Sequence, residues 1–323
     1  MLQESCIYIM IDSYEIAFKQ MKNEVKRILS TSPHIIREYT EHLAETSGKY
    51  IRGSALLICA EREDGTIHEN GVKLAAAIEI LHLATLVHDD VIDNADLRRG
   101  GITLQKKYGK RTAVICGDYL MCVALKLVAS ASNKEDYLDL EIPDYLNYIC
   151  LGELNQHINN GNFDLTVYQY LKIIYGKTAA LFEASFYAGA ILSETDENVK
   201  KKYAKMGRYV GMIFQLTDDC MDFETTESVA KKPVQSDYEQ DVITLPLIHA
   251  FRNFKHLRKK AEEEGITRKE VNEGVRKAGG LNYTRAIAKK YYNKYQITLD
   301  ELAITEDKRA RLISILDKAY RVF

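Results

Sequence analysis

The chain has 323 residues, of which 46% are hydrophobic and 28% charged, so it is long enough to bury a sizeable core. Its 44 basic and 46 acidic residues leave a net charge of −2, which gives no electrostatic reason for binding nucleic acid or an acidic membrane surface. Few breakers, with four prolines and 18 glycines, favour long helices, and six cysteines without a CxxC pair indicate reduced thiols in a cytoplasmic protein.

The N-terminal segment, residues 1–45, is expected to be helical and to pack on the rest of the chain. Glu4 and Asp12 interrupt its apolar patch and no basic region precedes it, so it does not resemble a signal peptide. The amphipathic pattern breaks near Ser32–Pro33. No uninterrupted apolar run of membrane-spanning length is present, so the sequence predicts no transmembrane segment.

The stretch SGKYIRG at 47–53 predicts a helix start that carries two cations, Lys49 and Arg52. Three residues apart, they would share one helical face. Cations at a helix N-terminus oppose the macrodipole unless an anion binds there, and such a terminus suits phosphate. Two solvated surface cations are the alternative for this motif alone. A polar loop is expected to follow over 61–71.

The central helix is predicted over 72–93 and ends in an acidic motif. Asp89, Asp90 and Asp93 follow an apolar run, and Asp89 and Asp93 are four residues apart on one face. Carboxylates at the inner end of an apolar helix repel each other and lose solvation, so they need a counter-charge. A solvated, charged helix end is the alternative explanation.

Three residues near this motif are candidates for binding anions. Arg98 and Arg99 follow it closely, and on a helical continuation their side chains would point about 100° apart. His82 lies about two turns before Asp89 on nearly the same face. A histidine there is either a satisfied core residue or a contact to a bound anion.

Helices are also expected over 103–130, from Pro143 to about 160, and over 166–189. Glu153 and Gln156 are polar residues on a buried run and are assigned structural hydrogen bonds. Lys177 lies in the apolar context of KTAALFEASFYAGA, where a cation is costly unless it pairs with an anion.

The acidic motif occurs a second time. Asp218, Asp219 and Asp222 repeat its spacing after another apolar helical run, and Gln215 and Asp218 belong to the same stripe at about 100° per residue. Two acidic faces from distant parts of the chain suggest one shared cavity, where each close carboxylate pair would cost roughly 1–4 kcal/mol. Oxygen ligands without His or Cys indicate Mg²⁺, which characteristically takes further ligands from phosphate.

These motifs together resemble those of the trans-isoprenyl diphosphate synthases. The resemblance rests on GKYIR, the two DDxxD motifs, RRG after the first, Lys177–Thr178, and KKP after the second, and it runs from about Gly48 to Pro246. Chain ends and small insertions are most similar to the catalytic large component of bacterial heptaprenyl and hexaprenyl diphosphate synthases. Ser47 and Gly53 depart from the family pattern but leave both cations, Lys49 and Arg52, in place. Lys231 and Asp241–Val242 also depart from it, which puts in doubt a third lysine contact to the allylic diphosphate from the loop after the second motif.

The resemblance implies an all-α, single-domain bundle over 1–323 around a central cavity, and head-to-tail condensation of an allylic diphosphate, farnesyl or geranylgeranyl, with isopentenyl diphosphate. It implies about three Mg²⁺ ions. The implied metal ligands are Asp89, Asp93 and Asp218, supported by Asp90, Asp219 and Asp222. The implied contacts to the allylic diphosphate are Arg98, Lys177 and Lys232, with Thr178 and Gln215 also in the substrate site. The implied contacts to isopentenyl diphosphate are Lys49, Arg52, His82 and Arg99.

Product length is expected to depend on residues one to two turns before Asp89. Ala84 and Thr85, where short-chain relatives carry aromatic rings, are too small to stop a growing chain, and Leu81 lies one turn further back. A product of C30–C40 is therefore expected, with a C15–C20 product as the alternative. The alternative is that Ala84 and Thr85 pack against a neighbouring helix and that other residues limit the chain length.

Other functions fit the sequence less well. A class I terpene cyclase shares the first motif but has a second motif of the form (N/D)DxxSxxxE, where this chain has Asp222 and Thr226. A non-catalytic regulatory subunit usually lacks the acids that are all present here, and an acidic metal buffer explains none of the cations. The expected assembly is a homodimer, or a heterodimer with a small non-catalytic subunit.

Overall fold

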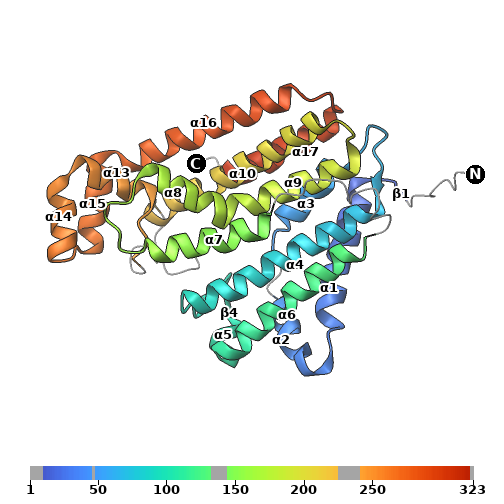
Figure 1. Ribbon diagram of the computed structural model, residues 1–323, viewed down its shortest axis with the longest axis horizontal. Coiled ribbons are helices and arrows are strands. Elements are labelled where there is room, and N and C mark those ends of the chain that lie inside the picture. Colours follow the sequence, from blue (N-terminus) through green and yellow to red (C-terminus); the bar gives the residue numbers. More distant parts are fainter. Residues whose placement is uncertain (1–9, 46–47, 132–143, 225–240, 321–323) are drawn as a thin grey trace, which may run out of the picture. The chain divides into compact units, whose positions relative to one another are not determined.

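The computed structural model describes residues 10–45, 48–131, 144–224 and 241–320, and almost all of these residues lie in helices (Figure 1). The all-α prediction is confirmed. The sheets within these ranges are two antiparallel pairs of two-residue strands, β1–β2 and β3–β4. The chain divides into two compact units, each assembled from three stretches of sequence. The prediction of a single domain remains a prediction.

The first unit comprises Met1–Ile142, Ala184–Ala204 and Ala303–Leu312. Its elements are β1 (Met10–Ile11), α1 (Tyr14–Ser30), α2 (His34–Glu45), α3 (Ile51–Ala60), β2 (Ile67–His68), α4 (Glu69–Ile92), β3 (Leu97–Arg98), β4 (Gly101–Ile102), α5 (Leu104–Tyr108) and α6 (Lys110–Ala129). It also contains most of α9 (Ala180–Ser193) and the first parts of α10 (Glu197–Glu224) and α17 (Glu306–Tyr320).

The second unit comprises Pro143–Glu183, Lys205–Leu302 and Ile313–Phe323. Its elements are α7 (Tyr145–Ile158), α8 (Val167–Ile174), the π-helical turn η2 (Tyr175–Ala179), α13 (Leu245–Asn253), α14 (Lys255–Glu263), α15 (Arg268–Ala278) and α16 (Gly280–Asp300). The remaining parts of α9, α10 and α17 complete it.

α4 is the central helix of the first unit. It is apolar for most of its length and packs along α6, which runs beside it (Figure 1). Ile80, Ala84 and Val87 of α4 belong to the same buried cluster as Cys116 and Leu120 of α6. This packing fixes the position of the acidic end of α4.

The N-terminal segment breaks where the sequence predicts. Ser13 caps α1, and the helix buries a stripe at helical spacing that includes Ala17, Met21 and Val25. α1 ends at Ser30 and α2 begins at His34, directly after Pro33, because proline cannot continue a helix but suits its start.

The prediction of a polar loop over 61–71 holds for residues 62–66 and is wrong for the rest. Ile67 and His68 form β2, which pairs with β1, and α4 already begins at Glu69. Glu61 is buried because its carboxylate accepts hydrogen bonds from Arg311 at 2.7 and 2.9 Å. Polar residues can thus be interior when a distant part of the chain supplies the partner.

The end of α3 is held by the last segment of the first unit. The buried Lys308 donates to the carbonyl oxygens of Cys59 at 3.1 Å and Glu61 at 2.7 Å. These are carbonyl groups that a helix C-terminus leaves without intrahelical partners. A lysine therefore caps α3 from a position 249 residues away in the sequence.

Two helices, α4 and α6, are long and apolar enough to cross a membrane by length and composition, with windows of mean hydropathy 1.4 and 1.7. Only 44% and 28% of the residues in these windows are buried. α4 is nevertheless a core helix of the first unit, and such helices pass the same test. α6 owes its low burial to an exposed apolar face formed by Val114, Ile115, Leu125 and Val128.

Candidate active site

The first acidic motif lies at the C-terminal end of α4. Asp89 and Asp90 are in the last turn, and Asp93 is the C-cap residue. The macrodipole places partial negative charge at this end of a helix, so three carboxylates here add to it rather than offset it. The arrangement therefore favours a bound cation.

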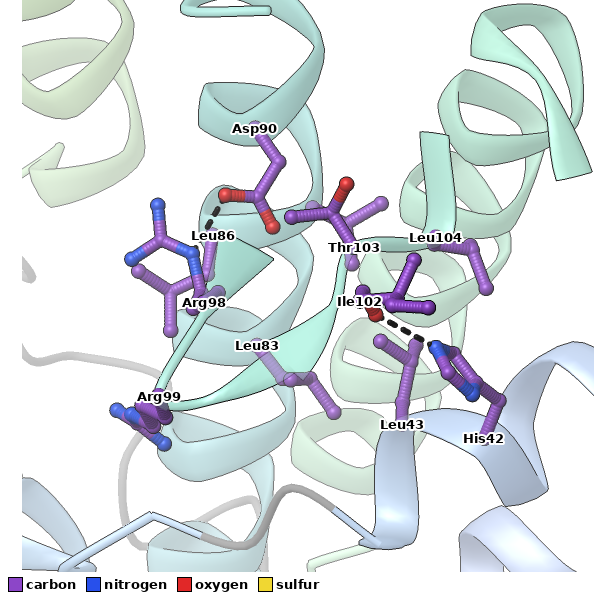
Figure 2. Close-up of a pocket in the computed structure, with 11 residues that line it drawn as sticks. His42, Leu43, Leu83, Leu86, Asp90, Arg98, Arg99, Ile102, Thr103 and Leu104 are labelled. Carbon is purple, nitrogen blue, oxygen red and sulfur yellow. Dashed lines mark hydrogen bonds and ion pairs between the residues drawn. The ribbon is translucent and has the colours of Figure 1, made fainter. Parts of the chain in front are cut away.

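The three carboxylates of this motif differ in burial. Asp90 is 6% exposed, whereas Asp89 and Asp93 are half-buried. Arg98 Nε donates to Asp90 Oδ1 at 2.6 Å, as Figure 2 shows. Burial raises the pKa of Asp90, and the Arg98 guanidinium opposes that rise. Asp90 is thus buried and paired within the protein, while Asp89 and Asp93 are half-buried.

The two arginines lie on a hairpin, not on a helix. Leu97–Arg98 pairs with Gly101–Ile102, and the two turn residues, Arg99 (φ 52°) and Gly100 (φ 81°), both have positive φ, as in a type I′ turn. The expectation of a helical continuation is wrong, because α4 ends at Ile92. Figure 2 shows Arg98 directed toward Asp90 and Arg99 directed away from it at the tip of the turn.

A small cavity lies under this hairpin. Its volume is about 20 Å³, room for about one water molecule, so it is not a substrate site. The His42 ring bonds the carbonyl of Ile102 at 2.9 Å and anchors the second hairpin strand above it (Figure 2). The lining residues are His42, Leu43, Leu83, Leu86, Val87, Asp90, Arg98, Arg99, Ile102, Thr103 and Leu104.

A second group of charges surrounds the start of α3. Arg52 is half-buried, and its Nη1 donates to His82 Nε2 at 3.1 Å. The carboxylate of Glu79, which is buried, accepts from the backbone N–H of Gly53 at 2.7 Å. One of the backbone N–H groups at this helix N-terminus, where the sequence predicts a bound phosphate, is therefore already hydrogen-bonded to Glu79. Anions in this region would be held by side-chain cations.

The charged residues of this group shift one another's pKa values. Burial raises the pKa of Glu79, and Arg52 and Arg99 oppose that rise. Burial lowers the pKa of Arg52 to about 10, so its guanidinium stays charged at neutral pH. Burial and the charges of Arg52, Arg99 and Arg98 hold the pKa of His82 well below its usual range. His82 is therefore neutral and accepts the hydrogen bond from Arg52.

Lys49 and Arg52 do not share a helical face. α3 begins at Ile51, and Tyr50, its N-cap residue, has a left-handed backbone (φ 51°), so Lys49 precedes the helix and is exposed. The expectation of a common face is wrong because it assumes that the helix includes Lys49. A left-handed backbone at a non-glycine residue costs about 1–3 kcal/mol and is found preferentially at functional sites.

The state of His82 leads to a prediction on pH. The folded protein favours the neutral imidazole, whereas the unfolded chain takes up a proton below pH 6.5. The wild-type free energy of unfolding should therefore fall as pH drops from 6.5 to 5, by up to about 1.4 kcal/mol per pH unit, relative to His82→Gln. Urea unfolding at both pH values measures this. His256→Gln, at an exposed histidine of α14, should track the wild type; a His82→Gln curve parallel to the wild type would refute the assignment.

The second acidic motif lies in the last turns of α10 and repeats the pattern of the first. Asp219 is 2% exposed, and Asp218 and Asp222 are half-buried. Gln215 Nε2 donates to Asp219 Oδ1 at 2.8 Å, and the Tyr170 hydroxyl donates to Oδ2. Burial raises the pKa of Asp219 to about 7, while both hydrogen bonds act to lower it. In each motif, then, the second aspartate is buried and hydrogen-bonded within the protein, and the first and last are half-buried.

Lys177 and Thr178 lie in the π-helical turn η2, where Ala180 N–H bonds the carbonyl of Tyr175. Such turns occur frequently at functional sites. Lys177 Nζ is 3.1 Å from a carboxylate oxygen of Glu153 on α7, so the anion that Lys177 requires is present in the protein. The hydrogen bond expected for Glu153 is therefore an ion pair. The Thr178 hydroxyl donates to Gln215 Oε1 at 2.7 Å, which links η2 to α10.

Close packing of α7 against η2 makes this ion pair possible. A Cβ at Gly152 would lie 2.3 Å from Lys177 N, and one at Gly176 would lie 2.6 Å from the Tyr148 carbonyl oxygen. Any other residue at either position would force the two backbones apart. The two glycines thus set the distance between Glu153 and Lys177.

The candidate chain-length residues have different surroundings on α4. Ala84 is fully buried in the core against α6 residues, whereas Leu81 and Thr85 are half-buried. The Thr85 hydroxyl donates to the carbonyl of His82 at 2.9 Å. Lys232, the remaining predicted contact, lies outside the described residues.

In the described part of the chain, no three His, Cys, Asp or Glu side chains come together as a ready-made metal site. Mg²⁺ does not require one, because it commonly binds one or two carboxylates and completes its octahedron with phosphate and water. The half-buried pairs Asp89 and Asp93, and Asp218 and Asp222, fit this mode.

Sequence reasoning missed Glu79 and Tyr170. Glu79 has a sequence signal, since it is an acid within the apolar run AAAIEILHLATLV, three residues from His82 on the same face. Tyr170 has none, because a tyrosine in an amphipathic helix is usually a packing residue. Its hydrogen bond to a residue 49 positions away is visible only in the structure.

Comparison with known proteins identifies a matching family and several relatives. The family model described as polyprenyl synthetase matches residues 33–278. Heptaprenyl diphosphate synthase component 2 of Geobacillus stearothermophilus is 33% identical over 290 residues, 88% of this chain and 90% of that protein. Octaprenyl diphosphate synthase of Escherichia coli is 32% identical over 290 residues, 87% and 88% of the two chains.

Solved structures of prenyl diphosphate synthases are similar to this structure. Heptaprenyl diphosphate synthase from Staphylococcus aureus has a TM-score of 0.86 at 29% identity and covers 96% of this chain and 98% of its own. A polyprenyl synthase from Caulobacter crescentus, complexed with calcium and isoprenyl diphosphate, has a TM-score of 0.84 at 27% identity, with 95% of both chains covered. An all-α fold with two aspartate motifs and these relatives defines a prenyltransferase. The chain belongs to the polyprenyl synthetase family.

Proposed function

We propose that the chain condenses isopentenyl diphosphate head-to-tail onto an allylic diphosphate, farnesyl or geranylgeranyl, and forms an all-trans polyprenyl diphosphate of C30–C40. The observation that carries the proposal is the repeated arrangement of the two aspartate motifs. Each has a buried second aspartate that is hydrogen-bonded within the protein and two half-buried carboxylates at the end of a helix. Relatives named heptaprenyl and octaprenyl diphosphate synthases support a long-chain product.

In this proposal, Asp89, Asp93 and Asp218 bind Mg²⁺, three ions in all as the family resemblance implies. Asp222 supports them directly or through water. Bound Mg²⁺ would neutralise the leaving pyrophosphate so that an allylic cation can form. Asp90 and Asp219 keep their neighbours in position.

The cations form two proposed sets. Arg98, Lys177 and Lys232 hold the allylic diphosphate, with Thr178 and Gln215 beside them. Lys49, Arg52, His82 and Arg99 hold isopentenyl diphosphate with its double bond toward the allylic carbon. Glu79 aligns the second set, because its carboxylate interacts electrostatically with Arg52 and Arg99. No side chain of the motifs is placed as a general base, and the departing pyrophosphate accepts the proton.

A second subunit is part of the proposal. The exposed apolar face of α6, with Val114, Ile115 and Leu125, supports association, because such faces are usually covered by a partner. The partner is a second copy or a small non-catalytic subunit, and sedimentation of the purified chain distinguishes the two. A cytoplasmic location is proposed with it.

Incubation with isopentenyl diphosphate, farnesyl diphosphate and Mg²⁺, followed by chromatography of the products, tests the function. A ladder ending at C30–C40, abolished by EDTA and restored by Mg²⁺, is expected. A cyclic hydrocarbon would instead indicate a terpene cyclase, and no turnover by the chain alone would favour a regulatory subunit or a missing partner.

Because Arg98 and Arg99 point in different directions on the hairpin, substitutions should affect KM for the two diphosphate substrates separately. Arg99→Ala and Lys49→Ala should raise KM for isopentenyl diphosphate roughly tenfold, the value of about one hydrogen bond to a charged group, with little change for the allylic substrate. Arg98→Ala and Lys177→Ala should do the reverse. Arg98→Ala should also raise the Mg²⁺ requirement, because it releases Asp90. Arg111→Ala, at an exposed arginine of α6, is the control. Equal KM patterns for Arg98→Ala and Arg99→Ala would contradict the assignment.

A further inference from the structure

Four side chains of the second unit form one chain of hydrogen bonds, whose donors all lead to the carboxylate of Asp219. The Thr178 hydroxyl donates to Gln215 Oε1, and Gln215 Nε2 donates to Asp219 Oδ1. The Tyr170 hydroxyl donates to Asp219 Oδ2. The Gln215 amide oxygen accepts one of these hydrogen bonds and the amide nitrogen donates the other, so the orientation of the amide is fixed. Both oxygens of the Asp219 carboxylate are thereby occupied.

The chain connects three elements. Tyr170 is on α8, just after the capping box that Thr166 and Gln169 form at its start. Thr178 is on η2, and Gln215 and Asp219 are one turn apart on α10. Tyr170, Thr178 and Asp219 are buried, at 3%, 7% and 2% exposure, so water is not at hand to replace a lost hydrogen bond.

This geometry has a consequence for the neighbouring aspartates. Asp219 points about 100° away from Asp218 around α10, while Asp222 returns to the face of Asp218. Anchoring Asp219 at both oxygens fixes the rotation of the end of α10, and with it the direction in which Asp218 and Asp222 face. Tyr170 supplies one of the two anchors from a different helix.

We propose that Tyr170 is a positioning residue of the active site: through Asp219 it sets the orientation of Asp218 and Asp222, and through Gln215 it couples them to Thr178. The inference rests on the proposed function, in which Asp218 binds Mg²⁺ and Lys177–Thr178 contact the allylic diphosphate. It assigns a role to a residue that touches neither the substrate nor the metal.

Tyr170→Phe removes one hydroxyl and tests the proposal. Tyr168→Phe makes the same deletion on the same helix at a residue that is 77% exposed, and is the matched control. The Mg²⁺ concentration for half-maximal activity should rise about tenfold in Tyr170→Phe, the worth of one hydrogen bond to a charged group, with KM for isopentenyl diphosphate unchanged. The rise in melting temperature caused by inorganic pyrophosphate with MgCl₂ should shrink. Tyr168→Phe should equal the wild type in both measurements.

Different results would overturn the proposed function and the role of Tyr170. A wild type that pyrophosphate and MgCl₂ do not stabilise would overturn the proposed function and the inference with it. A stabilised wild type that Tyr170→Phe matches in both measurements would overturn the inference alone. If Tyr170→Phe does not fold, judged by circular dichroism, Thr178→Val breaks the chain at its other end and Thr178→Ser retains the donor. A Mg²⁺ requirement raised in Thr178→Val and restored in Thr178→Ser supports the coupling, and equal requirements in the two variants overturn it.

Discussion

Asp89→Ala and Asp218→Ala should each lower turnover by at least roughly 10²–10³-fold, the range for losing one group that stabilises developing charge. Each would remove a half-buried carboxylate near a helix C-terminus, where the proposed metal ions neutralise the leaving pyrophosphate. The fold should survive, because these carboxylates repel one another and the helix dipole when no metal is bound. Without metal, the melting temperature should be equal to or higher than that of the wild type.

Steady-state kinetics with saturating Mg²⁺, together with thermal unfolding in EDTA, would measure both effects. Asp96→Ala and Asp164→Ala are the controls, since each removes an exposed aspartate that forms an ion pair, with Lys106 and Arg258 respectively. An unchanged rate in either motif variant would remove that motif from the mechanism. A lowered melting temperature in EDTA would show that the carboxylate stabilises the fold.

Thr85→Phe should convert the product from C30–C40 to chains of C20 or shorter. A chain that grows from Asp89 and extends back along α4 passes Thr85 after about one turn, or 5.4 Å, and a half-buried threonine leaves room there for a longer tail. A phenyl ring in that position would form a floor. Leu81→Phe, one turn further back, should shorten the product less.

Ala84→Phe is the contrasting variant. Ala84 is fully buried in the core of the first unit, so a ring there should overpack it and cost about 1–3 kcal/mol of stability. Chromatography of the products and urea unfolding separate the two effects. If wild type stops at C15–C20, or if Thr85→Phe makes full-length chains, the length of the product is set elsewhere.

Local patterns predict the elements of this structure that depend on local chemistry. Apolar runs at helical spacing predict α4 and α10, and the acids that end each run are plain in the sequence. Pro33 marks the break between α1 and α2. Each of these depends on residues within a few turns of one another.

Features that depend on distant partners could not be predicted in the same way. The sequence predicts a helical continuation at Arg98 and Arg99, which lie on a hairpin, and a loop that includes residues 67–68, which form β2. Both differences arise because a two-residue strand has almost no sequence pattern. Glu153 and Lys177 are each polar residues in an apolar context, and only the close approach at Gly152 and Gly176 reveals that they are partners. The roles of the individual site residues remain predictions.

The lysine cap on α3 bears on how the protein is made. Synthesis proceeds from the N-terminus, so the carbonyl groups of Cys59 and Glu61 are complete long before Lys308 and Arg311 exist. Until those residues emerge from the ribosome, the end of α3 lacks the partners that it has in the folded protein. Contacts between residues so far apart in the sequence also form slowly. A nascent chain arrested before the start of α17 should therefore be a client of chaperones, and the completion of the first unit should wait for translation of the second.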